Sequence, residues 1–281
     1  MCRLKSGILL RDRAYVPDHD KHDKMLKELG IQNDYIGASE KFVRFELYPK
    51  DGNLSTDVST WTMKVDQDIV PAWFDADREK YEGIIVDAVR RWAEEHIIKE
   101  GKHEKTEGFY YLVNDAEITL LDNAQAALLD NARATLWDNA RATLWDNAQA
   151  ELWDNAQAEL LDNSQATLWG NARATLRNNA NAMLRDSARA TLVGNARATL
   201  VGNAQATLCG SAIIGNCTIF DNAIVISHKD SKVYVSKNWD MEVIQCSTRF
   251  VPYAARGSTR ASAATASGRT GRAWTSTPCS R

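Results

Sequence analysis

The sequence predicts an α+β N-terminal domain followed by a β-solenoid, or β-helix, made of 8-residue repeats with about two repeats per coil. Three observations support this. The first 105 residues contain no repeat, leucine recurs at every eighth position from 120 to 208, and the composition changes abruptly after residue 245. We therefore divide the chain into a small α+β domain at 1–105, a solenoid at 106–226, C-terminal cap strands at 227–245 and a basic disordered tail at 246–281.

The overall composition is that of an ordinary soluble protein. The 281 residues are 44% hydrophobic and carry a formal net charge of −3. No apolar run approaches the roughly 18 residues that a membrane span needs, and Asp12 follows Leu9 and Leu10 too closely for a signal peptide. The five cysteines form no CxxC pair, which favours free thiols in a reducing compartment. We expect a protein that is cytoplasmic or part of a phage particle.

The N-terminal domain has four predicted elements. Residues 20–29 predict a short helix, and residues 42–48 alternate between apolar and polar in the manner of a strand. Residues 61–65 are the predicted partner of that strand. A long amphipathic helix follows, with Asp75 or Asp77 as its N-cap.

No group of residues in this domain has the spacing of a catalytic site. His19 and His22 are spaced to share a metal ion on a helix, but a solvated loop that leads into the helix explains them as well. Asp66, Asp68 and Asp75 offer oxygen ligands without the spacing of an EF-hand. The chain has no phosphate loop, GxSxG or HExxH motif. We therefore predict no enzyme, no cofactor and no metal site.

The repeat unit reads Ala-x-Ala-Thr-Leu-Trp-Asp-Asn, as in residues 140–147. On an α-helix, eight residues advance about 800°, so the leucine column would drift by about 80° per repeat and form no fixed apolar face. On a strand, both alanines and the leucine point to one side, and Arg or Gln and Thr or Glu point to the other. Asp-Asn or Gly-Asn supplies a turn. Each octapeptide is thus one strand and one corner, with two or three octapeptides per coil.

An asparagine column accompanies these corners. It runs at the repeat spacing from Asn123 to Asn203, with Ser187 as an interruption. Asparagine tolerates the left-handed backbone conformation, and its side chains can stack as amide ladders. We therefore expect the asparagines to adopt that conformation and to form ladders at the corners.

The repeat region resembles the short-period β-solenoids, including pentapeptide-repeat proteins and bacterial ice-nucleation proteins. The resemblance covers about residues 115–226 and concerns architecture. Ice-nucleation repeats present rows of Thr-x-Thr, whereas this chain presents Arg-Ala-Thr or Gln-Ala-Thr, which disfavours ice binding. Some pentapeptide-repeat proteins resemble duplex DNA in shape and negative charge, which suggests DNA mimicry as an alternative for the acidic repeats.

The N-terminal domain resembles an uncharacterised domain that precedes repeat regions in proteins of gut Firmicutes and their phages. The matching stretches are residues 1–8, 12–18 and 65–74. The resemblance implies a bacterial or phage origin and brings no known activity with it.

Two features of the repeat give candidate binding surfaces. A tryptophan column at an outward position would form an exposed apolar patch, although the rings could instead pack over the corners or against another element. Arginine or glutamine occupies an outward position in most of the strands. The candidate binding residues are Trp137, Trp145, Trp153, Trp169, Arg133, Arg141 and Arg173.

Charge is distributed unevenly along the chain. Residues 122–167 carry a net charge of −6, residues 168–211 carry +4, and residues 246–281 hold six arginines and no acidic residue. The acidic face, an alternative site, consists of Asp122, Asp130, Asp138, Asp146, Asp154 and Asp162. Solvated structural corners are the simpler explanation for these aspartates.

We predict a non-enzymatic structural or protein-interaction scaffold that binds a protein partner or a second copy of itself and does not associate with membranes. The alternative is a nucleic-acid-related protein. It would act as a DNA mimic through the acidic repeats or as a nucleic-acid binder through the Arg-rich tail. No residue pattern identifies the partner, the biological process or the oligomeric state.

Overall fold

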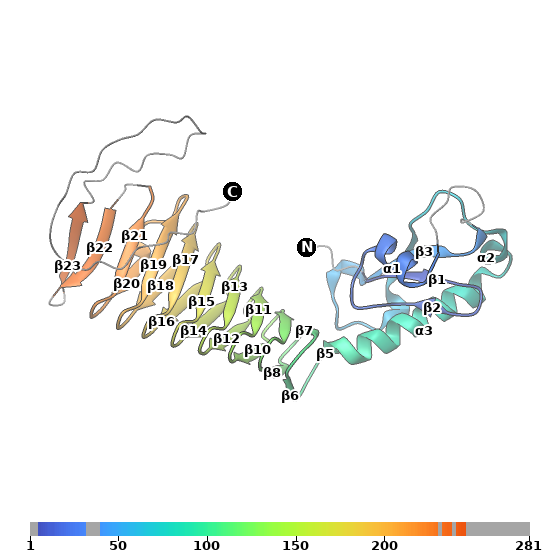
Figure 1. Cartoon of the computed structure of the whole chain (residues 1–281), viewed down its shortest axis with the longest axis horizontal. Coiled ribbons are helices and arrows are strands. Elements are labelled where there is room, and N and C mark those ends of the chain that lie inside the picture. Colours follow the sequence, from blue (N-terminus) through green and yellow to red (C-terminus); the bar gives the residue numbers. More distant parts are fainter. Residues whose placement is uncertain (1–4, 32–39, 230–231, 238–239, 246–281) are drawn as a thin grey trace, which may run out of the picture.

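The computed structural model describes residues 5–31, 40–229, 232–237 and 240–245. They form a small N-terminal domain with helices and an antiparallel sheet, followed by a long parallel β-solenoid (Figure 1). This architecture confirms the predicted fold class.

The N-terminal domain is built on a four-stranded sheet in the order β2-β1-β3-β4. The strands are β1 (Lys5–Leu9), β2 (Ala14–Tyr15), β3 (Val43–Tyr48) and β4 (Thr62–Val65). The predicted pairing of β3 with β4 is confirmed and is antiparallel. Strand β1 was not predicted, because all five of its residues are buried and it lacks the alternation of a half-exposed strand.

In the described part of this domain, three helices accompany the sheet. They are α1 (His22–Glu28), α2 (Ala72–Ala76) and α3 (Arg78–His96), and short 3₁₀ turns lie at Lys50–Gly52 and Val58–Thr60. The apolar side of α3, including Ile85 and Val89, packs with Phe45 and Phe74 in one core. Asp77 is the N-cap residue of α3, as predicted, but its side chain makes no capping hydrogen bond.

The solenoid consists of two sheets, which we call the even sheet and the odd sheet after the numbers of their parallel strands. The even sheet contains β6 (Lys102–Lys105), β8 (Glu117–Leu120), β10 (Arg133–Leu136), β12 (Gln149–Leu152), β14 (Gln165–Leu168), β16 (Asn181–Leu184), β18 (Arg197–Leu200) and β20 (Cys217–Ile219). The odd sheet contains β5 (Ile97–Ile98), β7 (Phe109–Leu112), β9 (Gln125–Leu128), β11 (Arg141–Leu144), β13 (Gln157–Leu160), β15 (Arg173–Leu176), β17 (Arg189–Val193), β19 (Gln205–Cys209), β21 (Ile224–Ser227), β22 (Lys232–Lys237) and β23 (Asp240–Gln245). Strand β22, which is antiparallel to its neighbours, belongs to the odd sheet although its number is even.

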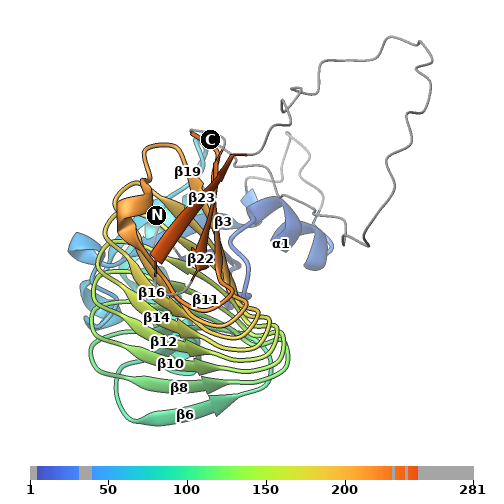
Figure 2. The ribbon, with the colours of Figure 1, turned by 90° about the vertical axis from the view of Figure 1, so that its left-hand side faces the viewer.

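The strand register sets the size of the coil. Arg133 pairs with Gln149 and Leu136 pairs with Leu152, so neighbouring strands are related by a shift of sixteen residues. Two octapeptides therefore make one coil, and the alternative of three per coil is excluded. The parallel pairing repeats from coil to coil, so the even strands stack as a continuous sheet (Figure 2).

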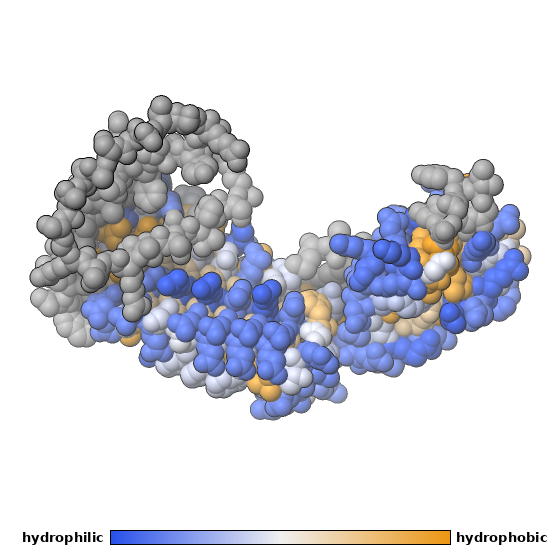
Figure 3. Space-filling view, in the orientation of Figure 1, coloured by the Kyte–Doolittle hydropathy of each residue, from blue (hydrophilic) through white to orange (hydrophobic). Residues whose placement is uncertain are grey.

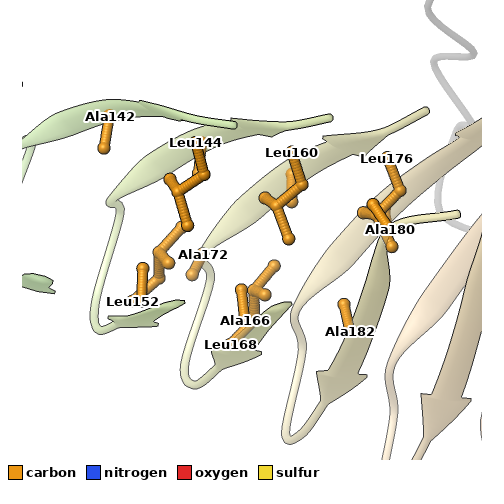
Figure 4. Close-up of a cluster of buried hydrophobic side chains, with 14 of the residues drawn as sticks. Ala142, Leu144, Leu152, Leu160, Ala166, Leu168, Ala172, Leu176, Ala180 and Ala182 are labelled. Atoms are coloured by element: carbon orange, nitrogen blue, oxygen red, sulfur yellow. The ribbon is translucent and has the colours of Figure 1, made fainter. Parts of the chain in front are cut away.

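The core of the solenoid is a narrow layer of alanine and leucine. Leucines from the two sheets, such as Leu144 and Leu152, point toward one another with alanines beside them (Figure 4). The repeat leucines are at most 1% exposed, and the alanine columns are at most 9% exposed. Ser164 replaces one alanine and is fully buried, and its hydroxyl donates a hydrogen bond of 2.6 Å to the carbonyl of Leu161.

The corners differ from the prediction in two respects. The left-handed conformation lies on the residue before each asparagine, for example Asp138 (φ 56°) and Asp154 (φ 57°), and Gly170 occupies the same position with φ 66°. Within the described residues, no side-chain hydrogen bond joins one member of the asparagine column to the next. The backbone makes the ladder instead, since the amide of Asn155 donates to the carbonyl of Asp138 at 3.0 Å. The predicted amide ladder is therefore wrong, because main-chain partners already satisfy the corner.

The ends of the solenoid are irregular. Strand pairing in the two sheets begins at β5 and β6, ahead of residue 106. Ala198 pairs with Cys217, which is three residues farther along the chain than the regular shift of sixteen would give. The additional residues accompany a 3₁₀ turn at Ile214–Asn216, before β20. Strands β22 and β23 then pair antiparallel at the end of the odd sheet, which confirms the two predicted closing strands. The predicted tail at 246–281 lies outside the described residues.

Substitutions at Asp154 test whether the corner residue has a left-handed backbone conformation. We expect Asp154→Ala to lower the free energy of unfolding by about 1–2 kcal/mol relative to Asp154→Gly, because only glycine adopts positive φ without strain. Urea unfolding of the full chain would measure the difference. Equal stability of the two variants would contradict the left-handed assignment.

Candidate binding surfaces

The outer face of the even sheet is hollowed into a shallow trough of about 710 Å³. Its floor is the main chain at buried alanines such as Ala150 and Ala166, and its two walls are rows of outward side chains that follow the solenoid axis. Those wall residues are Lys102, Glu117, Thr119, Arg133, Thr135, Gln149, Glu151, Gln165, Thr167, Asn181, Met183 and Thr199. His103 also lines the trough, from the register position of the inward Ile118. Hydrophilic residues also dominate the solenoid surface that Figure 3 shows.

The charges of this trough are nearly balanced. Lys102 Nζ lies 3.0 Å from a carboxylate oxygen of Glu117, and Arg133 lies 3.9 Å from the other oxygen. Farther along the axis, the walls consist mainly of amides and hydroxyls, as at Gln165 and Thr167. The trough therefore offers hydrogen bonds to an uncharged, extended ligand.

The three candidate arginines lie on two opposite faces. Arg133 belongs to the trough, whereas Arg141 and Arg173 are exposed in one column on the odd sheet, with Gln157 between them. Arg141 and Arg173 make no ion pair with any described residue. The sequence placed the three residues at equivalent repeat positions but did not show that successive octapeptides face opposite ways.

Three of the four candidate tryptophans form a stack along the corner that follows the even strands. The ring centroids of Trp137 and Trp153 are 5.1 Å apart, and those of Trp153 and Trp169 are 5.0 Å apart, with interplanar angles of 12° and 2°. The guanidinium of Arg185 covers the end of the stack, 4.7 Å from the Trp169 ring centroid. Both faces of Trp153 are therefore covered by other rings, and a ligand could reach only the edge of this ring.

Trp145 lies on the opposite corner and packs against the core of the N-terminal domain. Val113 and Leu129 occupy the same corner position on the preceding coils and are buried in that core. The tryptophans therefore do not form one stripe. Trp145 helps to dock the domain onto the solenoid, which is the alternative that the sequence left open.

The six aspartates of the predicted acidic face are divided between the two corners. Asp122, Asp138 and Asp154 follow even strands, and the other three follow odd strands. The carboxylate of Asp130 accepts a hydrogen bond of 3.1 Å from the amide of Asn114, one coil away. Asp146 accepts a similar bond of 3.4 Å from the amide of Asp130. These carboxylates help to satisfy the corner backbone.

The potential metal ligands of the N-terminal domain are not brought together. His19 Nε2 lies 3.0 Å from a carboxylate oxygen of Glu28. His22 contacts the carbonyl of Phe45 at 3.2 Å and the carboxylate of Asp66 at 3.3 Å. Among the described residues, no group of three or more His, Cys, Asp or Glu side chains is arranged to hold a metal ion.

The junction of the domain and the solenoid contains a cluster that the sequence did not reveal. The buried Lys5 Nζ lies 3.1 Å from Asp20 Oδ1 and 4.4 Å from the Trp92 ring centroid. His96 Nε2 lies 3.0 Å from Asp18 Oδ1. Burial lowers the pKa of the Lys5 amine, and burial together with Asp20 raises the pKa of Tyr111. These contacts tie the loop at residues 18–20 to β1 and α3, and no sequence spacing predicts them.

Cys209 and Cys217 are eight residues apart, but the structure does not place them at equivalent positions. Cys209 pairs with Val193 at the position after leucine, whereas Cys217 pairs with the inward Ala198. Cys209 is disulfide-bonded, so the prediction of a free thiol is wrong for this residue, since sequence spacing does not show which sulfurs meet in space. Cys217 is free, as predicted, and its side chain is buried. Burial raises the pKa of the Cys217 thiol to about 12.

No protein-family model matches this chain, and neither the curated proteins nor the solved structures contain a match. Among the helices of the described residues, none has the length and apolar character that crossing a membrane requires.

The tryptophan stack predicts a difference between two substitutions. Trp153→Ala removes two ring contacts, whereas Trp137→Ala removes one, so we expect Trp153→Ala to cost about 0.5–1.5 kcal/mol more stability. Urea unfolding of both variants would measure this. Equal losses would argue against an energetic role for the stacking.

Burial of Cys217 predicts that its thiol is protected from alkylation at pH 8. The thiolate is the reactive form, and a pKa of about 12 leaves very little of it at that pH. We expect iodoacetamide to modify Cys217 only after denaturation, as measured by peptide mass spectrometry. Rapid modification of the native protein would show that the site opens.

Proposed function

We propose that the chain is a non-enzymatic interaction scaffold and that the trough on the even sheet is its binding surface. The observation that carries this proposal is a hollow of about 710 Å³ that runs across neighbouring coils of a continuous parallel sheet. A volume of this size lies within the range of about 300–1,000 Å³ that is common for ligand sites. The backbone ladder holds the wall side chains at fixed spacing, so little ordering would be needed on binding.

An extended polypeptide segment is the partner that fits this trough best. The coils are about 4.8 Å apart, so outward amides and hydroxyls recur at that spacing along the axis. Peptide groups can donate to and accept from Gln149, Gln165 and Thr167, whose side chains line the walls. The paired charges near Glu117 leave little net charge to attract a polyelectrolyte.

The proposed setting is a bacterium or its phage, in the cytoplasm or in a phage particle. The likeness of residues 1–8, 12–18 and 65–74 to the N-terminal domain of repeat proteins from gut Firmicutes and phages supports this origin. The N-terminal domain would then orient the solenoid, since Val113, Leu129 and Trp145 dock it onto one corner.

The nucleic-acid-related function is a weaker candidate. A DNA mimic needs carboxylates at regular spacing on one surface, and each corner does carry aspartates at the spacing of the coils, as at Asp138 and Asp154. However, the aspartates lie on two corners, and Asp130 and Asp146 accept backbone hydrogen bonds. The arginines at 246–281, which would carry the alternative binding mode, lie outside the described residues.

Photo-crosslinking tests the scaffold proposal. A p-benzoylphenylalanine at position 165 would lie in the trough, and the same group at position 163 would lie on a corner and serve as the control. We expect a defined protein adduct from position 165 and not from position 163, when the full chain is expressed in its natural host. A p-benzoylphenylalanine at position 149 would also lie in the trough. Adding Thr167→Arg to that variant would obstruct the trough and should abolish the adduct.

Adducts of the same proteins from positions 165 and 163 would contradict a role for the trough. Adducts that persist unchanged in the Thr167→Arg variant would contradict it as well. Circular dichroism of each variant would verify that the strand content is retained.

A further inference from the structure

The outer face of the odd sheet carries unpaired positive charge in its C-terminal half. We call this surface the basic face, and it spans strands β15, β17 and β19. Its outward residues are Arg173, Thr175, Arg189, Thr191, Gln205 and Thr207. Arg173 and Arg189 are both exposed.

These two arginines lie directly beside each other. Arg173 pairs with Arg189 in the parallel register, and adjacent strands are about 4.8 Å apart. Neither makes an ion pair with a described residue, and like charges at opposed positions of a sheet are destabilising. The fold does not need this pair, because glutamine occupies the same column at Gln157 and Gln205.

The corners beside this face have lost most of their negative charge. The left-handed position is aspartate in every repeat from Asp122 to Asp162. In five of the six repeats that follow it is uncharged, at Gly170, Asn178, Gly194, Gly202 and Gly210. Each of these residues meets the same backbone requirement as aspartate and carries no charge. The change therefore removes acidic groups around the arginines while it preserves the corner.

The acidic groups that remain near this face are already engaged. Glu159 accepts a hydrogen bond of 2.9 Å from Arg177 Nε. Asp186 accepts a hydrogen bond of 3.3 Å from the amide of Gly170. The guanidinium groups of Arg173 and Arg189 are thus left available for an external anion.

We propose that the basic face binds an acidic polysaccharide whose chain lies along the solenoid axis. Guanidinium groups pair with carboxylate groups through two parallel hydrogen bonds, and the neighbouring threonine hydroxyls can bond sugar hydroxyls. Single-stranded nucleic acid is disfavoured because its binding surfaces combine positive charge with aromatic rings, and the outward residues of this face include no aromatic. This face is distinct from the trough, so the inference does not depend on the proposed scaffold function.

The experiment uses affinity electrophoresis of the full chain in gels that contain polygalacturonate at low salt. We expect the R173Q/R189Q variant to bind about tenfold more weakly, and binding to fall as salt is raised, because exposed charges are screened. The control is R133Q/R197Q, which removes the same charge from the even sheet and should change binding less than twofold. Glutamine is native to both columns, so both variants should fold.

Several outcomes would overturn the inference. These are absence of binding to polygalacturonate, equal weakening by the two double variants, and retention by neutral dextran as strong as that by polygalacturonate. Tighter binding to poly(dT) than to polygalacturonate, lost in R173Q/R189Q, would identify the face as a nucleic-acid surface instead.

Discussion

The backbone ladder between residues sixteen positions apart is the constraint on which the whole solenoid depends. Each strand of four or five residues is too short to be stable alone, so every coil relies on its neighbours. The ladder requires the same inward side chains at each step, which alanine and leucine supply. It also requires a corner residue with positive φ, which aspartate, asparagine or glycine supplies. Outward positions and the position after leucine remain free to vary, and the outward positions carry the two candidate surfaces.

The two corners have different roles although their sequences are equivalent. On one corner, the position after leucine docks the N-terminal domain through Val113, Leu129 and Trp145. On the other, Trp137, Trp153 and Trp169 stack on one another beneath Arg185. A tryptophan at this position is thus half-buried, either against another domain or against its own copies.

Sequence periodicity predicted the solenoid well, because a repeat of eight fits strands and does not fit a helix. It also predicted the pairing of β3 with β4 and the closing strands β22 and β23. It did not predict the trough, since a repeat seen in one dimension does not show which octapeptides share a face. Strand β1 and the contacts of Lys5 were not predicted from the sequence, for a related reason. Burial on all sides removes alternation, and ion pairs between distant segments leave no local pattern.

Because the coils are nearly identical, the solenoid can change in length by whole coils. A pairing error of one full coil would preserve almost every internal contact, so only irregular features define the correct alignment. The extra turn at Ile214–Asn216 marks one end, and the docking of Trp145 marks the other. Between these marks, gain or loss of a sixteen-residue unit would shift the cap by about 4.8 Å and leave both ends intact. The length of such a solenoid can therefore change in evolution while its fold stays the same.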